Sequence, residues 1–349
     1  MKKLLFILLP LLFVLTAILI VTQMSASPLF YVDTMPGLSE CTEVDSLLLY
    51  RLKSNLNNVN LKGVMGGSEV EFLVSTNSNG LRSPEASRDG GRYRILVLGD
   101  SCTFGLGVGN DETYPARLER LLNDRVPGER RFEVFNAGVP GYAAWQGARY
   151  LAARGMKLEP NLVIACFGNN DIVPDEDPTS TNPLPDLLHG GFIQEKLMAL
   201  GLYRLVIAAQ IQFLNSPERR KVKGDLRTGV PPAEQAFEAY LLEIAKVCRE
   251  HKTALMFMVW PLLPQVLDRQ GRPEAVSAMQ PFRSRIRNQS IVREVAQSQG
   301  VWLVNPLPAL AAAEQGPLYL GPIHANKKGL EVIAGVLRDA ILENVLQPK

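Results

Sequence analysis

Histidine is scarce in this sequence of 349 residues. The three histidines are His189, His251 and His324. Any reaction that needs an imidazole as its base therefore has three candidates. Because His251 ends a predicted helix and His189 lies in an insertion, we interpret both as structural, which leaves His324 as the candidate base.

Metal-binding cysteine patterns and a strong net charge are also missing. The four cysteines are Cys41, Cys102, Cys166 and Cys248, and no two of them have the C-x-x-C spacing typical of metal sites. The 37 basic and 35 acidic side chains nearly cancel. We therefore predict no bound metal and no disulfide framework, and the charge gives no electrostatic basis for a nucleic-acid partner.

The sequence has a single apolar run of the length that a bilayer core requires. Lys2 and Lys3 precede an uncharged stretch from Leu4 to Thr22. The residues that follow, 23–28, make a poor cleavage site. We predict an uncleaved membrane anchor over residues 1–26, with a signal segment as the alternative. The two lysines predict that the rest of the chain lies outside the cytoplasm, in the periplasm.

From Tyr93 onwards, short apolar runs alternate with helical patterns. The expected strands cover residues 94–98, 132–135, 161–167, 254–260 and 301–304. The expected helices cover residues 114–123, 143–154, 233–251, 285–298 and 326–345. This alternation predicts an α/β fold with three layers, α/β/α, and a flavodoxin-like parallel sheet of five strands in the order 2-1-3-4-5.

These patterns divide the chain into three segments. They are residues 1–26, the anchor; residues 27–92, a stem with a short β lead-in; and residues 93–349, the α/β domain. Within the stem, a helix is expected over residues 44–56 and a strand over residues 69–75. An insertion at about residues 172–230 interrupts the alternation, and it is either a lid on the substrate side or a solvated excursion.

Residues suited to acyl chemistry follow the predicted strands. Ser101 comes after the first strand, Gly141 lies in the loop after the second, Asn170 follows the third, and His324 precedes the last helix. Because the carboxyl ends of parallel strands meet at one edge of a sheet, we expect these residues to lie together. Acyl transfer needs a nucleophilic hydroxyl, a base and donors for an oxyanion. Ser101 can be the nucleophile and His324 the base, and the N–H groups of Ser101 and Gly141 with the amide of Asn170 can be the donors.

Three short motifs at these positions resemble those of a known family. They read Gly99-Asp100-Ser101, Asn136-Ala137-Gly138-Val139-Pro140-Gly141 and Gly168-Asn169-Asn170-Asp171. In this order they make the chain from about Tyr93 to Val345 resemble the SGNH, or GDSL-type, hydrolases, and residues 77–82 resemble a lead-in of extracytoplasmic bacterial members. The resemblance implies the nucleophile role for Ser101 and oxyanion roles for Gly141 and Asn170. It also implies esterase, lipase or carbohydrate-deacetylase activity without a metal or a cofactor.

The fourth motif departs from the family pattern. The family has D-x-x-H before the last helix, whereas this chain has Gly321-Pro322-Ile323-His324. The acid that orients the histidine of a catalytic triad is therefore missing. Three interpretations stay open: a carbonyl or a water orients His324 in a working Ser101–His324 dyad, Glu314 replaces the acid, or the site binds an acyl group without efficient turnover.

The sequence thus predicts a membrane-anchored, extracytoplasmic serine esterase of SGNH type that hydrolyses or transfers ester-linked acyl groups. The alternatives are a catalytically weakened fold that binds an acylated envelope ligand and an O-acyltransferase with the same residues. The predicted location favours small-molecule, lipid or polysaccharide esters as substrates. Asp100 and Asp171 are expected to be structural, Asp100 as a cap of the following helix and Asp171 as a tie between loops.

Overall fold

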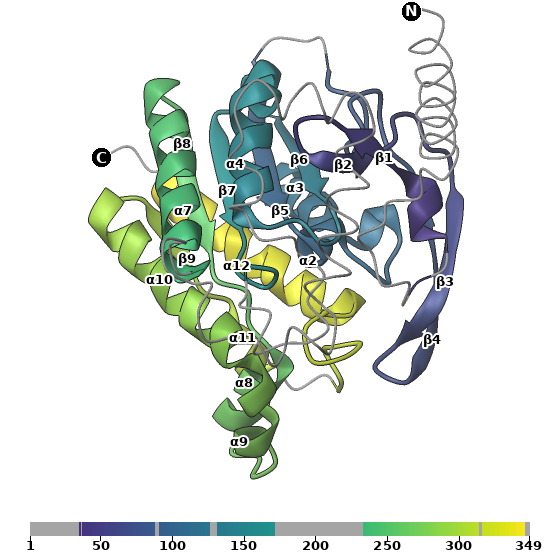
Figure 1. The fold of residues 1–349 in the computed structure, drawn as a ribbon, viewed down its shortest axis with the longest axis vertical. Helices are drawn as coiled ribbons and strands as arrows, with labels where there is room; N and C mark the ends of the chain where they lie inside the picture. The colour runs from purple at the N-terminus through teal and green to yellow at the C-terminus, as the bar shows by residue number, and fades with distance from the viewer. Residues whose placement is uncertain are drawn as a thin grey trace, which may run out of the picture.

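The fold is built around a five-stranded sheet (Figure 1). The computed structural model describes residues 35, 37–87, 91–125, 131–171, 233–313 and 316–345. The strands of the sheet are β5 (Tyr93–Gly99), β6 (Phe132–Gly138), β7 (Leu162–Cys166), β8 (Ala254–Met258) and β9 (Trp302–Val304). They are parallel throughout and lie in the order β6-β5-β7-β8-β9, which confirms the predicted order 2-1-3-4-5.

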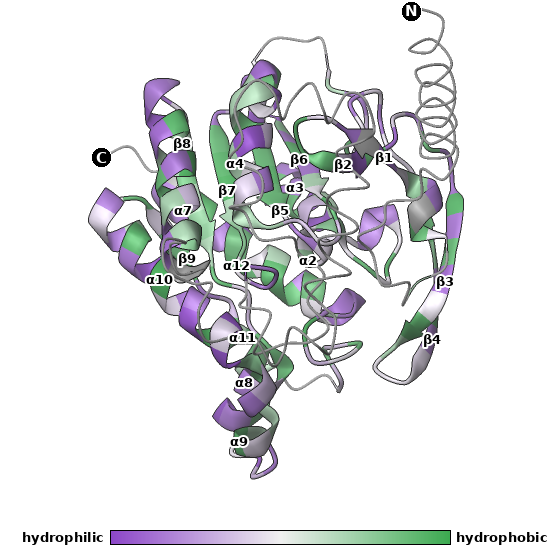
Figure 2. Cartoon of the chain, viewed as in Figure 1, coloured by the Kyte–Doolittle hydropathy of each residue, from purple (hydrophilic) through white to green (hydrophobic). Residues whose placement is uncertain are grey.

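Helices cover both faces of the sheet. One face carries α4 (Ala144–Ala153), α7 (Ala233–Glu250) and α10 (Arg283–Gln299). The other carries α3 (Tyr114–Arg125), α8 (Leu263–Arg269), α11 (Leu307–Ala312) and α12 (Lys327–Val345). Alternating side chains of β5 serve the two cores, Leu96 and Leu98 on the first face and Ile95 and Val97 on the second. A strand covered on both faces needs apolar residues throughout, and Figure 2 shows the central strands as hydrophobic.

Two antiparallel hairpins precede the sheet. They are β1 (Thr42–Asp45) with β2 (Leu49–Leu52), and β3 (Val59–Met65) with β4 (Ser68–Val74). The strand expected over residues 69–75 is confirmed as β4, but the helix expected over residues 44–56 is wrong. The Asp45 carboxylate accepts hydrogen bonds from the N–H groups of Leu47 at 2.9 Å and Leu48 at 3.0 Å. This local turn reverses the chain where a helix would have continued.

The described part of the predicted stem packs against the sheet. Its buried side chains, among them Leu52, Leu61 and Phe72, share one hydrophobic core with Leu96 of the central strand. The lead-in therefore contributes to the same folded body as the sheet, and the segment boundaries themselves stay predictions.

The predicted anchor, residues 1–26, and the insertion at residues 172–230 lie outside the described residues. Among the helices that the structure describes, none is both long enough and apolar enough to cross a bilayer. Membrane anchoring therefore stays a prediction from the sequence.

Candidate active site

Ser101 begins a one-turn helix, α2 (Ser101–Phe104), immediately beyond the central strand. The Asp100 carboxylate caps this helix and accepts a hydrogen bond from the N–H of Cys102 at 2.8 Å. Its other oxygen accepts one from the amide of Asn169 at 3.1 Å. Burial raises the pKa of Asp100. The structural role predicted for Asp100 is confirmed, because its carboxylate fixes the turn that carries Ser101.

The other end of α2 is held by a buried arginine, Arg82. Its guanidinium donates to four backbone carbonyls: Phe104 at 2.7 Å, Gly105 at 2.9 Å, Val108 at 2.6 Å and Leu73 at 3.0 Å. Two of these carbonyls end α2, and the last belongs to β4. Arg82 therefore joins the lead-in to the helix that begins with Ser101.

The hydroxyl of Ser101 meets the imidazole of His324. Oγ and Nε2 lie 2.8 Å apart, which is the reach that general-base catalysis requires. Both residues are partly buried. The neighbouring thiol of Cys102 is buried, and this burial raises its pKa well above the usual range. The hydroxyl, and not the adjacent thiol, is therefore the group that the histidine contacts.

One backbone and two side-chain hydrogen bonds hold the loop that carries His324. The N–H of Leu320 donates to the carbonyl of His324 at 2.8 Å and closes a tight turn. The indole N–H of Trp260 donates to the carbonyl of Ile323 at 2.8 Å. The hydroxyl of Tyr319 donates at 2.8 Å to the carbonyl of the residue that follows Trp260. The chain after β8 thus holds the loop at two points that precede the histidine, Tyr319 and Ile323, a contribution that no sequence pattern indicated.

The surroundings of His324 favour its neutral form. Arg285 of α10 is buried and donates from Nε to the carbonyl of Asn169 at 3.0 Å. Desolvation of the imidazole, with a further contribution from the positive charge of Arg285, lowers the pKa of His324 to about 4. No described residue bonds to Nδ1 of His324, and Glu314, the predicted substitute for the acid, lies outside the described residues. Neutral imidazole is the state that can accept the Ser101 proton.

Gly141 lies in a tight turn that contacts Asn170. The N–H of Tyr142 donates to the carbonyl of Val139 at 3.1 Å, and Gly141 has φ 82°, as a type II turn requires. The side-chain amide of Asn170 donates to the carbonyl of Tyr142 at 2.9 Å. The structure therefore brings the regions of Gly141 and Asn170 together, while their oxyanion roles stay predictions.

The lead-in also holds this turn. The hydroxyl of Tyr50 in β2 donates to the carbonyl of Pro140 at 2.8 Å, and the hydroxyl of Tyr142 donates back to the carbonyl of Tyr50 at 2.6 Å. The two rings meet edge to face with their centroids 5.4 Å apart. This reciprocal pair fastens the turn of Gly141 to the first hairpin.

Asp171 ties several elements together, as predicted. Its carboxylate accepts hydrogen bonds from the N–H of Ala144, the first residue of α4, at 2.8 Å and from the N–H of Gly168 at 3.1 Å. Asn288 of α10 donates to the carbonyls of Gly168 at 2.9 Å and Asp171 at 2.6 Å. Burial, with the nearby charge of Asp100 as a smaller contribution, raises the pKa of Asp171 to about 7.

Replacing Asp171 with asparagine is expected to lower the free energy of unfolding by about 1–3 kcal/mol, because an amide has one acceptor oxygen and leaves an N–H unsatisfied. The loss is expected to be larger at about pH 5 than at about pH 8. Between 3.8 and about 7 the folded protein holds a proton on Asp171 that the unfolded chain releases, so the stability contributed by the aspartate falls as pH rises through this window. Urea unfolding at both pH values measures the difference, and equal losses would contradict the raised pKa.

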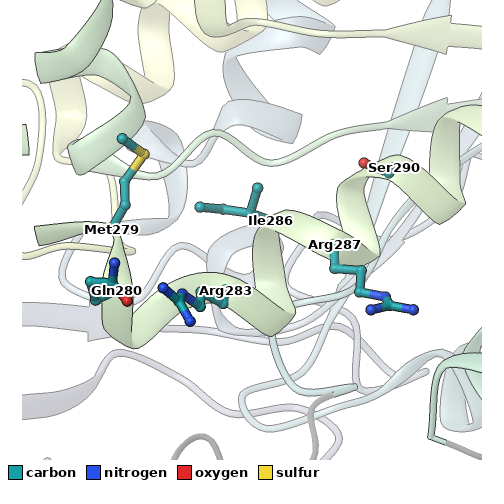
Figure 3. Close-up of a pocket in the computed structure, with 6 residues that line it drawn as sticks. All are labelled: Met279, Gln280, Arg283, Ile286, Arg287 and Ser290. Carbon is teal, nitrogen blue, oxygen red and sulfur yellow. The ribbon is translucent and has the colours of Figure 1, made fainter. Parts of the chain in front are cut away.

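A hollow of about 240 Å³ lies at the start of α10, and Figure 3 shows the side chains that line it. It is lined by Met279, Gln280, Arg283, Ile286, Arg287 and Ser290. The residues of α10 that bond to the site loops, Arg285 and Asn288, lie on a different face of the helix. The hollow is therefore separate from the site around Ser101 and His324.

A parallel sheet between helices, with a serine after its first strand and a histidine before the last helix, defines the class of α/β/α serine hydrolases. The chain belongs to the GDSL-like lipase/acylhydrolase family, whose sequence model matches residues 97–332, more than half of the chain. This confirms the resemblance to SGNH hydrolases. No curated protein matches the chain.

Several solved structures are similar to this chain at low sequence identity. The acetyl xylan esterase AlAXEase is 14% identical, with a TM-score of 0.45 and coverage of 71% of this chain and 99% of the esterase. A lipase/acylhydrolase from Enterococcus faecalis is 14% identical, with a TM-score of 0.44 and coverage of 74% and 98%. A mutant of Axe2, an acetyl-xylooligosaccharide esterase from Geobacillus stearmophilus, is 15% identical, with a TM-score of 0.46 and coverage of 74% and 97%. The family assignment rests on the sequence match.

Proposed function

We propose that this protein is a serine esterase that hydrolyses ester-linked acyl groups through a Ser101–His324 dyad. The contact of 2.8 Å between Ser101 Oγ and His324 Nε2 carries the proposal, because it places a base within reach of a hydroxyl at the end of the central strand. By the resemblance, Gly321 stands where the family has its acid, so we assign the orientation of His324 to the hydrogen bonds that hold its loop. Of the three open interpretations, these bonds favour the dyad.

The reaction has two steps, acylation of Ser101 and hydrolysis of the acyl-enzyme. The Oγ of Ser101 attacks the ester carbonyl carbon while its proton passes to Nε2 of His324. The resulting oxyanion is bound by the N–H groups of Ser101 and Gly141 and the amide of Asn170. The bond from carbon to the alcohol oxygen then breaks, Nε2 returns the proton to the leaving alcohol, and the acyl group stays on Ser101. Water gives a proton to Nε2 and attacks the acyl carbon, and Ser101 recovers the proton as the acid leaves.

The proposed substrates are small-molecule, lipid or polysaccharide esters outside the cytoplasm. The support for this location is the basic and apolar start of the sequence, from Lys2 to Thr22. If a sugar hydroxyl takes the place of water in the second half-reaction, the same residues perform O-acyl transfer. Product analysis with a polysaccharide acceptor separates hydrolysis from transfer.

Labelling with a fluorophosphonate probe tests the proposal. An activated serine forms an oxygen–phosphorus bond and displaces fluoride, while its proton is taken by the base. We expect one adduct, on Ser101, that is lost in Ser101→Ala and strongly slowed in His324→Ala. Ser290, an exposed serine of α10, is the internal control and is expected to stay unlabelled. A folded wild-type protein without an adduct on Ser101 would instead favour the alternative of a catalytically weakened fold that binds an acylated ligand.

A further inference from the structure

The loop that carries His324 touches the β3–β4 hairpin of the lead-in, which lies at the right-hand side of Figure 1. The hairpin turns through Gly66 and Gly67, both with positive φ, between the paired residues Met65 and Ser68. A Cβ at Gly66 would lie only 1.9 Å from the carbonyl oxygen of Leu320. The hairpin tip and the histidine loop therefore pack backbone against backbone.

The hairpin covers the side of the loop on which a side chain at position 321 would begin. A Cβ at Gly321 would lie 3.5 Å from N and 3.6 Å from Cα of Gly66. The side chain of Leu320 is partly buried against the same core as Met65. A Cβ at Gly107, just after α2, would lie 2.4 Å from Cδ1 of Leu320 and 3.1 Å from Sδ of Met65. The tip thus packs beside the position at which the family has its acid.

The backbone of Leu320 is hydrogen-bonded directly to the backbone of His324. Its N–H donates to the carbonyl of His324 at 2.8 Å, and the adjacent Tyr319 pairs with Ala325 in an antiparallel bridge. The residues between them form a closed turn. A displacement of the Leu320 carbonyl therefore displaces the backbone of His324.

We propose that the tip of the β3–β4 hairpin, through Gly66, is a positioning element for His324. The proposal rests on the esterase function proposed above, since it concerns the base of the same dyad. A triad acid both orients the histidine and stabilises the imidazolium. The hairpin supplies the first of these two effects by supporting the loop from outside. Gly66 touches no reacting atom and precedes the region matched by the family, residues 97–332.

Alanine at position 66 and alanine at position 67 form a matched pair of variants. Both place an L-residue at positive φ, so the backbone strain is common to the two. Only Gly66→Ala overlaps the loop, because a Cβ at Gly67 meets nothing within 4 Å. The hairpin and the loop must separate by about 1 Å, a misplacement that can cost about 10²-fold in rate. We expect kcat of Gly66→Ala to fall about 10²-fold below that of Gly67→Ala, with a much smaller change in KM. The melting temperature of Gly66→Ala is expected to be the lower of the two, and kcat is compared well below both melting temperatures.

Nitrogen NMR of the histidines separates this proposal from the esterase proposal. The Nε2 signal of His324, assigned with a His324→Asn variant, reports the hydrogen bond to Ser101. We expect Gly66→Ala to move it towards its position in Ser101→Ala, while Gly67→Ala leaves it in place and the His251 signal is constant. If the wild-type protein hydrolyses no ester but the signals behave in this way, the esterase proposal fails and the positioning role stands. If the wild type is active and both glycine variants lose kcat equally, the positioning role is overturned.

If Gly66→Ala does not fold, Met65→Ala is a second variant that tests whether the hairpin positions His324. Met65 Sδ and Leu320 Cδ1 both lie close to Gly107, so this truncation removes hairpin packing near Leu320 without a backbone clash. Val64→Ala, at the neighbouring exposed position, is its control. We expect kcat to fall in Met65→Ala and to stay unchanged in Val64→Ala. Equal kcat in the two variants would overturn the proposal.

Discussion

Alanine in place of Ser101 is expected to lower kcat for hydrolysis of a p-nitrophenyl ester by about 10³-fold or more, because it removes the atom that forms the acyl-enzyme bond. Alanine in place of His324 is expected to cause a loss of similar size, since Oγ and Nε2 meet at 2.8 Å and act as one unit. The double variant is therefore expected to be no slower than either single variant. Steady-state kinetics of the three variants measure this non-additivity.

His251→Ala is the matched control for the histidine. His251 is exposed after α7, at the edge of the sheet opposite to Ser101, because β8 begins a few residues later and runs parallel to β5. The kcat of His251→Ala is expected to equal that of the wild type. Melting temperatures of all variants show that the fold persists. A Ser101→Ala variant that kept more than about a tenth of the wild-type kcat would mean that another group attacks the ester.

The sheet could be predicted from the sequence because both of its faces are covered. The run from Ile95 to Leu98 is apolar at each position, and a strand with one solvated face would alternate instead. The meeting of Ser101 with the loop of His324 then follows from topology, because parallel strands end at one edge of the sheet and this loop follows the last strand. Sequence reasoning is strong where a periodic pattern and a topological rule agree.

The contacts that hold the site loops in place could not be predicted from the sequence, because in each of them a side chain or a glycine meets backbone atoms of another segment. The guanidinium of Arg82 binds four carbonyls, and every residue has a carbonyl, so no pattern of side chains identifies the contact. The packing of Gly66 against Leu320 likewise depends on the absence of a Cβ and on two segments far apart in the chain. Arg285 looks in the sequence like any other arginine of a helix, although it is buried beside the site. Such contacts appear only when the tertiary structure is known.

Hydrolysis of an uncharged ester is expected to continue to an unusually low pH. His324 must be neutral to accept the proton of Ser101, and its pKa is lowered to about 4. At about pH 5 roughly 90% of such an imidazole is neutral, whereas a histidine of ordinary pKa would be about 3% neutral. As pH falls through about 4 the base becomes protonated and kcat/KM is lost. The acid limb of the kcat/KM profile is therefore expected near 4, measured with recovery at neutral pH as the control for unfolding.

Substitution of two arginines of α10 distinguishes the two causes of the low pKa of His324, desolvation and the charge of Arg285. Arg285→Gln removes a positive charge beside the imidazole, so the acid limb is expected to move to higher pH, while desolvation keeps it below 6.5. Arg283→Gln removes the same charge from an exposed position at the hollow of Figure 3 and is expected to leave the limb in place. A wild-type limb near 6.5 would instead indicate a partner acid such as Glu314. The low pKa also has a consequence for the rate, because a weaker base draws the Ser101 proton less strongly, so the surroundings that keep His324 neutral in acid limit kcat at neutral pH.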